Sequence, residues 1–207
     1  MLKTKNISRK QKIHKSLSKH TFLHSILKMK NLNVDDSLVF IPASIDDYYK
    51  LEEVKADYYK GNIVMNSPAS YQHETYFMKI SNSIYNYLNK KEAGEVLGSR
   101  FTIVFGKNRF EPDIFVVLTK NNGIFKEHEF IGTPDLIIEI LSKSTKQYDL
   151  INKRQVYQEY KVPEIWFVDY IENKIIIDYF IENEYITKEF DLNGNIESKV
   201  LEGIELK

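Results

Sequence analysis

The sequence predicts a single α/β domain in which helices pack on the faces of a mixed β-sheet. Three observations lead to this prediction. The chain has 207 residues, a length that suits one domain. Hydrophobic residues make up 43% of it, enough for a core of ordinary size. Its predicted elements run in the order helix, antiparallel strands, helix and further strands, which is typical of a sheet covered by helices.

The first part of the chain predicts a short helix, a hairpin and a long helix. The short helix covers residues 44–54 and begins at Ser44, a residue type that caps helices. Residues 57–66 (DYYKGNIVMN) predict a hairpin with a turn at 60–62. The long helix covers residues 70–91. Its apolar stripe has helical spacing and consists of Phe77, Ile80, Ile84 and Leu88.

The middle of the chain predicts three strands. Residues 95–106 (EVLGSRFTIVFG) and 110–118 (FEPDIFVVL) form two strands around a turn at 106–108. Residues 119–133 form a loop. The stretch TPDLIIEILSKST then supplies a strand over about residues 134–141, in which large aliphatic side chains surround one glutamate.

A helix and three strands complete the predicted domain. The SKST segment offers caps for a helix over residues 146–160. Residues 163–170 (PEIWFVDY) and 173–180 (NKIIIDYF) predict a hairpin, and a weaker strand follows near residues 185–190.

Charge is distributed unevenly along the chain. Residues 1–30 contain nine Lys or Arg and no acidic residue, which leaves 20 basic and 29 acidic residues in the other 177. We expect residues 1–35 to be a disordered basic extension and residues 36–207 to form the domain. Two alternatives are an arm that binds nucleic acid or an anionic surface and a translation start at Met29. The acidic body by itself argues against a phosphate-binding protein.

Several classes of protein are excluded by composition. Cysteine is absent, so the chain has no disulfide, no thiolate zinc site and no cysteine nucleophile. No apolar run approaches the length of a membrane span, and no signal-peptide core is present. A cytoplasmic protein is therefore expected. Only His73 and His128 lie outside the basic arm, which argues against a histidine metal cluster.

Glu139 is a charged residue in an otherwise apolar strand, where an aliphatic side chain would be more stable. Strand side chains alternate between two faces, so Glu139 shares its face with Ile137 and Leu141. If this strand pairs with the preceding one symmetrically about the loop centre at residue 126, Asp113 lies opposite Glu139 with Cβ atoms about 5 Å apart. A shift of one residue would separate the two acids.

Two buried carboxylates at this distance repel each other, and burying them costs several kcal/mol without a partner. A divalent cation would supply that partner, because Mg²⁺ prefers hard oxygen ligands and is often bound by a couple of carboxylates and water. The alternative is that each acid lies at a strand end and pairs with solvent or a lysine.

Lys153 is predicted to point toward the sheet. It shares one face of the helix 146–160 with Leu150, Tyr157 and Tyr160, at spacings of three, four and three residues. An ammonium group placed inward needs an anion, and Glu139 is the candidate. The alternative is a lysine whose stem packs while its charge reaches water.

Two further residues are candidates for the site. Asp57 precedes the turn of the first hairpin and could add a metal ligand or simply be a solvated strand residue. His73 lies in the first turn of the long helix, where it could contact phosphate or water or only cap the helix.

The segment GTPDLIIEILSKST…YDLINKRQVYQEYKVPEIWFVDY resembles the signature of the Uma-two-type putative restriction endonuclease family, which has the PD-(D/E)xK nuclease-like fold. FEPDIFVVL resembles the family's Pro-Asp strand, and YYKGNIVMNSPASYQHE resembles its glycine hairpin and following helix. The likeness extends over about residues 44–180. It implies a restriction-endonuclease-like mixed sheet flanked by helices, with additional antiparallel hairpins.

The resemblance also implies roles for individual residues. Asp113 and Glu139 would be the metal-binding acids. Leu141 occupies the usual lysine position of the D/ExK tripeptide, and Lys153 would supply the lysine from the helix. Tyr157 would support the site.

The chain departs from the family pattern at two positions. Asp57 stands where the family usually has Glu, which is one methylene longer. Lys161 stands where it commonly has Gly. Since that glycine would serve the end of the helix, we expect Lys161 to change the fold locally and to leave the chemistry intact.

The leading functional hypothesis is an endonuclease that hydrolyses DNA phosphodiester bonds with Mg²⁺ or Mn²⁺. Asp113, Glu139 and Lys153 would be catalytic, and Asp57 would assist at the metal. One alternative is a catalytically silent module on a nuclease fold that binds nucleic acid or protein. Another is an enzyme that uses the same site on RNA or nucleotides. A homodimer is expected only by analogy with other nucleases of this fold.

Overall fold

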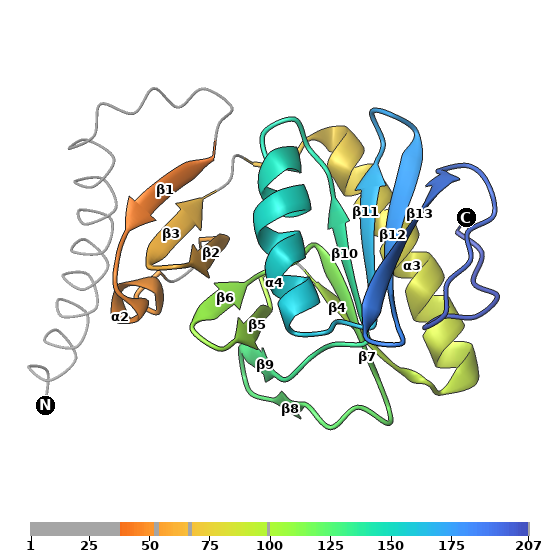
Figure 1. The fold of residues 1–207 in the computed structure, drawn as a ribbon, viewed down its shortest axis with the longest axis horizontal. Coiled ribbons are helices and arrows are strands. Elements are labelled where there is room, and N and C mark those ends of the chain that lie inside the picture. The colour runs from red at the N-terminus through yellow and green to blue at the C-terminus, as the bar shows by residue number, and fades with distance from the viewer. Residues whose placement is uncertain (1–37, 52–53, 66–67, 99, 207) are drawn as a thin grey trace, which may run out of the picture.

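The computed structural model describes residues 38–51, 54–65, 68–98 and 100–206, which form an α/β fold with two sheets (Figure 1). The predicted N-terminal extension, residues 1–35, lies outside the described part of the chain. The predicted α/β class is confirmed.

The larger core is built on a six-stranded mixed sheet in the order β13-β12-β11-β10-β7-β4. Strands β10 and β11 are parallel, and the other neighbours are antiparallel. The predicted hairpin over 163–180 is confirmed as β11 and β12, and the strand expected near 185–190 is β13. The strands are β4 (Gly94–Gly98), β7 (Ile114–Leu118), β10 (Leu136–Ile140), β11 (Glu164–Asp169), β12 (Lys174–Ile181) and β13 (Glu184–Asp191).

The additional hairpins form a second sheet, which the sequence did not predict. Its order is β1-β3-β2-β6-β5-β9-β8, and it includes the predicted hairpin with its turn at Lys60 and Gly61. The strands are β1 (Val39–Pro42), β2 (Ala56–Tyr59), β3 (Asn62–Met65), β5 (Thr102–Phe105), β6 (Asn108–Phe110), β8 (Ile124–Phe125) and β9 (Glu129–Ile131).

Three predictions for the middle of the chain were wrong in detail. The strand expected over 95–106 is two strands, β4 and β5, in different sheets; Arg100 between them has a positive φ of 85°, so the chain changes direction there. The strand expected over 110–118 is likewise divided, since Pro112 cannot donate a ladder hydrogen bond. The loop 119–133 contains β8 and β9, which pair with each other.

The helices begin where the sequence predicted. Ser44 caps α2 (Ile45–Tyr48) in a capping box with Asp47, although this helix is shorter than expected. Ser70 caps α3 (Tyr71–Lys91) by accepting a hydrogen bond from the His73 amide. The helix expected over 146–160 contains a π-helical segment, η1 (Tyr148–Lys153), that continues as α4 (Arg154–Glu159).

The two faces of the six-stranded sheet bury different elements. Ile137 and Leu141 face α4 and the second sheet, whereas Ile138 faces α3. Figure 1 shows α3 and α4 on opposite sides of this sheet. The side chains of β10 therefore alternate between the two faces as predicted. The apolar stripe of α3 packs against the wholly apolar face of β10, which carries Ile138.

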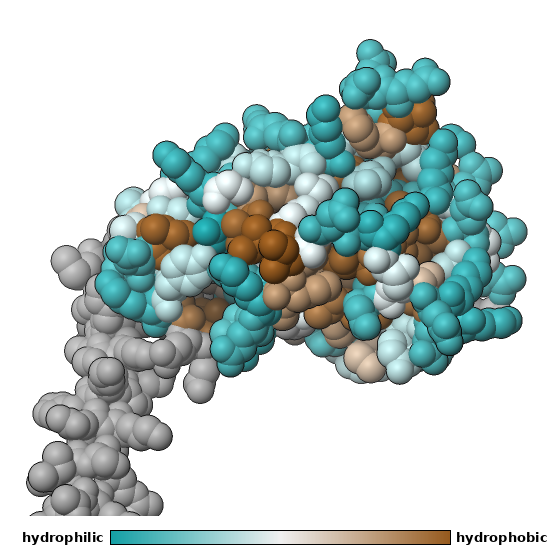
Figure 2. Space-filling model, turned by 90° about the horizontal axis from the view of Figure 1, so that it is seen from below, coloured by the Kyte–Doolittle hydropathy of each residue, from teal (hydrophilic) through white to brown (hydrophobic). Residues whose placement is uncertain are grey.

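Figure 2, the view from below, shows hydrophilic side chains mainly around the margin of that face and apolar side chains gathered toward its middle. Among the described residues, no helix is long and apolar enough to cross a membrane.

Glu164 attaches the C-terminal segment to the six-stranded sheet. Its fully buried carboxylate accepts hydrogen bonds at one oxygen from Trp166 Nε1 (2.6 Å) and Ser198 Oγ (2.7 Å). The other oxygen accepts from the amides of Lys199 (2.7 Å) and Val200 (3.1 Å). Four donors thus converge on one carboxylate and hold the segment that covers the α3 side of the core.

Replacing Glu164 by glutamine should lower the free energy of unfolding by about 2–3 kcal/mol. The glutamine side chain keeps the size of glutamate, but its N–H₂ group would face either Trp166 and Ser198 or the amides of Lys199 and Val200, which are themselves donors. Urea denaturation would measure the change. The matched control is Glu95→Gln on β4, where the side chain is exposed, and equal stabilities of the two variants would contradict the prediction.

Candidate active site

The pairing of β7 with β10 brings Asp113 and Glu139 to the same place. The observed partners Leu136–Val116, Ile137–Phe115 and Ile138–Ile114 have the predicted register. The next pair in that register is Glu139 and Asp113. Asp113 stays attached to β10, because its Oδ2 accepts a hydrogen bond from the Ile140 amide at 2.9 Å. The predicted proximity of the two acids therefore follows from strand register.

Gly98 allows this arrangement to form next to β4. A Cβ atom on Gly98 would lie 2.0 Å from the carbonyl oxygen of Asp113, which is closer than any side chain can approach. The backbone that carries Asp113 can therefore pack against β4 only because residue 98 is glycine.

Lys153 points into the buried centre, as predicted. Its Nζ lies 3.0 Å from Glu139 Oε1 and 3.4 Å from both Asp57 Oδ2 and Asp149 Oδ1. Only 2% of Lys153 is exposed, so its ammonium group does not reach bulk water. Burial alone would lower the pKa of Lys153, but Asp57, Glu139 and Asp149 outweigh it and hold this pKa well above its ordinary value. The lysine is therefore a buried cation shared by three acids.

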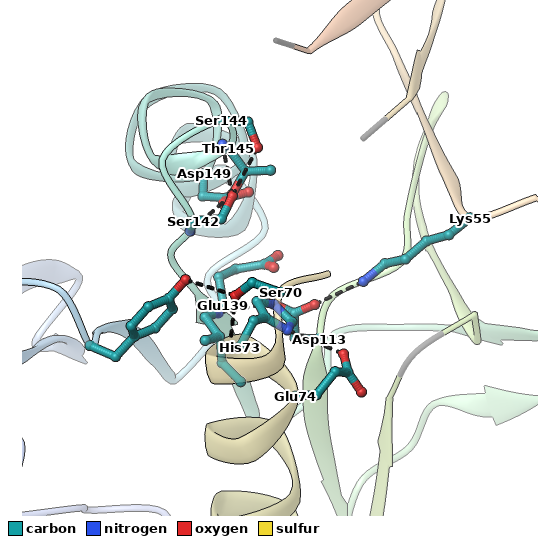
Figure 3. A network of polar contacts seen from close by, with 12 residues as sticks. Lys55, Ser70, His73, Glu74, Asp113, Glu139, Ser142, Ser144, Thr145 and Asp149 are labelled. Atoms are coloured by element: carbon teal, nitrogen blue, oxygen red, sulfur yellow. Dashed lines mark hydrogen bonds and ion pairs between the residues drawn. The ribbon is translucent and has the colours of Figure 1, made fainter. Parts of the chain in front are cut away.

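Asp113 has two cationic partners of its own (Figure 3). Lys55 Nζ lies 2.8 Å from its Oδ1, and His73 Nε2 lies 3.2 Å from its Oδ2. Burial would raise the pKa of Asp113, but Lys55 and His73 together lower it. Burial by itself would lower the pKa of His73. The neighbouring Asp113 carboxylate outweighs burial, so the pKa of His73 is raised above its ordinary value. The structure thus places the first turn of α3 against the carboxylate cluster.

Burial and neighbouring carboxylates act against the charged form of Glu139. Burial raises its pKa to about 8; Lys153 opposes this rise, and Asp149 and Asp113 add to it. Tyr157, fully buried on α4, donates a hydrogen bond to Glu139 Oε1 at 2.5 Å. Tyr157 therefore supports the carboxylate, as expected.

Asp57 enters the site from the second sheet. Its Oδ1 accepts a hydrogen bond from the Glu111 amide at 2.8 Å, across the β2–β6 junction. Its Oδ2 is buried, and no group in the described part of the chain donates a hydrogen bond to it. The alternative of a solvated strand residue is wrong for Asp57, because only 3% of it is exposed.

The sequence did not identify Asp149, Lys55 and Glu111. Asp149 lies four residues before Lys153 on the same helix, a spacing that could have revealed it. Lys55 and Glu111 carry no such signal, since they join the site through the second sheet. Burial and the nearby Asp57 raise the pKa of Glu111 to about 7.

The donor set fits a hard divalent cation. Asp113, Glu139 and Asp57 offer carboxylate oxygens, and Asp57 Oδ2 is buried, accepts no hydrogen bond among the described residues and has Lys153 Nζ at 3.4 Å as its ion-pair partner. The described residues include no ready-made group of three His, Asp or Glu ligands. Lysines pair with all three candidate ligands: Lys55 with Asp113, and Lys153 with Glu139 and Asp57. A site of one or two carboxylates completed by water, the common arrangement for Mg²⁺, agrees with these observations.

The positions of Leu141 and Lys161 have clear structural outcomes. Leu141 is buried in the apolar core and contributes no charge, while Lys153 occupies the centre. Lys161 adopts a positive φ of 55° two residues after the last residue of α4. Its amide donates to Gln158 O at 3.0 Å and the Val162 amide donates to Tyr157 O at 3.0 Å. The position thus ends the helix in the conformation that glycine favours.

Comparisons with known proteins identify the family and the fold. The Uma2 family, described as "Putative restriction endonuclease", matches residues 45–207. An uncharacterized protein of Synechocystis sp. is 29% identical over 126 residues, covering 58% of this chain and 65% of the relative, so the chain spans just under two thirds of the relative's length.

A solved structure shares the fold. It is the crystal structure of a putative nuclease belonging to DUF820 from Anabaena variabilis, with a TM-score of 0.65 and 19% identity, covering 78% of this chain and 92% of that one. The predicted nuclease-like fold is therefore confirmed.

Proposed function

The chain belongs to the Uma2 family of putative restriction endonucleases, and on that premise we propose that it is a metal-dependent endonuclease that hydrolyses DNA phosphodiester bonds. One observation carries the proposal: Asp113, Glu139, Asp57 and Lys153 come from four separate elements and converge in one buried centre. A core has no structural need for so many charges, because an apolar cluster of the same volume would be at least as stable.

Each residue of the centre has a role in this proposal. Asp113 and Glu139 would hold a Mg²⁺ or Mn²⁺ ion, with Asp57 as a third oxygen donor. A bound ion of this kind stabilises negative charge on phosphate and lowers the pKa of water. Lys153 would orient the attacking water or stabilise the developing charge on the phosphate.

Tyr157 and His73 would act on the carboxylates. Tyr157 holds Glu139 Oε1 by its hydroxyl group and so sets the direction of that carboxylate. His73 holds Asp113 Oδ2 in the same manner and lies at the start of α3, where the helix dipole favours an approaching anion. The expected DNA partner is consistent with this placement, and the expected homodimer stays a prediction.

A second candidate function is a non-cleaving binding module on the same fold. The observation that favours it is the complete pairing of Asp113 and Glu139 with Lys55 and Lys153. In that case the ion pairs would be structural and metal would have no effect.

Metal titration separates the two functions. Saturating Mg²⁺ or Mn²⁺ should raise the midpoint of thermal unfolding of the wild-type chain by about 5–10 °C. Glu139→Gln should remove this shift, because it removes a ligand, and Glu95→Gln should retain it. No shift in the wild-type chain would favour the binding module.

A further inference from the structure

A cavity of about 380 Å³ lies beside the carboxylate centre. It is lined by residues of α2, β5 and β9 and of the segments next to them, including Tyr48, Tyr49, Leu51, Thr102 and Glu111. Cavities of this size are in the range that binds small molecules or parts of larger ones.

Glu111 is the unusual member of this lining. It is only 7% exposed. Tyr48 Oη approaches Glu111 Oε1 at 3.5 Å, at the outer limit of a hydrogen bond. Glu111 Oε2 is buried, and the residues described here provide no donor for it. Leaving such an acceptor unsatisfied costs about 1–3 kcal/mol, so the cavity favours a ligand that brings an N–H group.

The other walls suit a flat ring. Tyr48 and Tyr49 lie with ring centroids 5.4 Å apart and an interplanar angle of 70°. Half of Tyr49 is exposed, and Leu51 adds an aliphatic surface. Arg100 lies in the lining as well, where a guanidinium group can face an anion.

The cavity is connected to the carboxylate centre by direct contacts. The Glu111 amide donates to Asp57 Oδ1 at 2.8 Å, and Asp57 Oδ2 lies 3.4 Å from Lys153 Nζ. One residue, Glu111, therefore faces the cavity with its side chain and the centre with its backbone.

We propose that this cavity binds a nucleobase that carries an exocyclic amino group, with Glu111 as the acceptor of that group. The inference rests on the proposed function, because it is the neighbouring phosphodiester site that makes a nucleotide the expected ligand. Guanine fits best, since its ring N–H and amino group present two adjacent donors to one carboxylate. Thymine fits worst, because carbonyl oxygens flank its single N–H and would face the carboxylate.

Binding of free 2′-deoxynucleosides, measured by calorimetry without metal at pH 8, above the pKa of about 7 to which burial and Asp57 raise Glu111, tests the proposal. Deoxyguanosine should bind at least about tenfold more tightly than thymidine. Glu111→Gln should weaken deoxyguanosine binding about tenfold, and Glu95→Gln should leave it unchanged. Tyr49→Ser should also weaken it about tenfold by removing a stacking surface; the same change removes the hydrogen bonds of Tyr49 Oη with Glu129 and Arg109.

Two results would overturn the proposal: no saturable binding of any deoxynucleoside, or deoxyguanosine binding that Tyr49→Ser and Glu111→Gln leave unchanged. If Glu111→Gln does not fold, Tyr49→Ser decides. The readout needs no cleavage, so a chain that binds deoxyguanosine but never cuts DNA would refute the nuclease function and keep the cavity. A chain that cuts DNA but binds no nucleoside would refute the proposed base-binding cavity and keep the nuclease function.

Discussion

Replacing Lys153 by methionine should lower the free energy of unfolding by about 3–5 kcal/mol at neutral pH. The methionine side chain keeps the length and apolar contacts of lysine but removes the ammonium group. Asp57, Glu139 and Asp149 are then left together in a buried space without the cation that lies within 3.4 Å of each. Urea denaturation would measure the loss.

The loss should grow with pH. Glu139 already has its pKa raised to about 8 by burial, and without Lys153, which opposes that rise, the pKa would be higher still. A folded-state pKa above the unfolded one means that the folded chain holds the proton more tightly, so stability falls as pH rises between the two values. Lys153→Met should therefore be more destabilising at pH 9 than at pH 5.

Lys143→Met is the matched control, since Lys143 is exposed on the segment just before the same helix. It should change stability by less than about 0.5 kcal/mol. A loss below about 1 kcal/mol for Lys153→Met would show that the three carboxylates do not depend on the ammonium group.

The second large effect concerns cleavage. Asp113→Asn and Glu139→Gln should each reduce the rate of nicking of supercoiled plasmid DNA in Mg²⁺ or Mn²⁺ by at least about 100-fold. Both changes keep side-chain size and remove a negative charge from the proposed metal ligands. The rate of conversion from supercoiled to open-circular DNA is the measurement.

Glu95→Gln is the control, and thermal unfolding of every variant shows whether it is folded. Glu139→Gln in particular should remain folded, because it removes a carboxylate whose burial is costly. Wild-type rates in Asp113→Asn and Glu139→Gln would exclude these acids from catalysis. No nicking by the wild-type chain, together with an absent metal shift, would favour the binding module.

Two components of the site followed from local periodicity. Because side chains alternate along β10, Glu139 was predicted on the face opposite the apolar residues that pack against α3. Pairing the two strands symmetrically about the 119–133 segment predicted that Glu139 lies across from Asp113. The helical spacing of Leu150, Lys153 and Tyr157 predicted an inward lysine. These predictions succeeded because side-chain direction in a strand or helix depends on position in the element.

The second sheet could not be predicted in the same way. Its strands are two to four residues long and come from segments as distant as β1 and β9. Segments this short carry little periodicity, and their pairing depends on contacts between distant parts of the chain. Residues 95–106 are the clearest example. Their sequence pattern predicts one continuous strand, but the segments before and after Arg100 belong to different sheets.

The sequence by itself determined the fold class, the caps at Ser44 and Ser70, and the register that brings Asp113 to Glu139. Only the tertiary structure decided that Asp57 contacts Lys153, that Lys55 pairs with Asp113, and that Glu111 lines a cavity. The physical reason is that strand and helix geometry fix the direction of a side chain within its element. The partner it meets depends on how separate elements pack, and Asp57, Lys55 and Glu111 reach the site from the second sheet and the residues next to its strands β2 and β6.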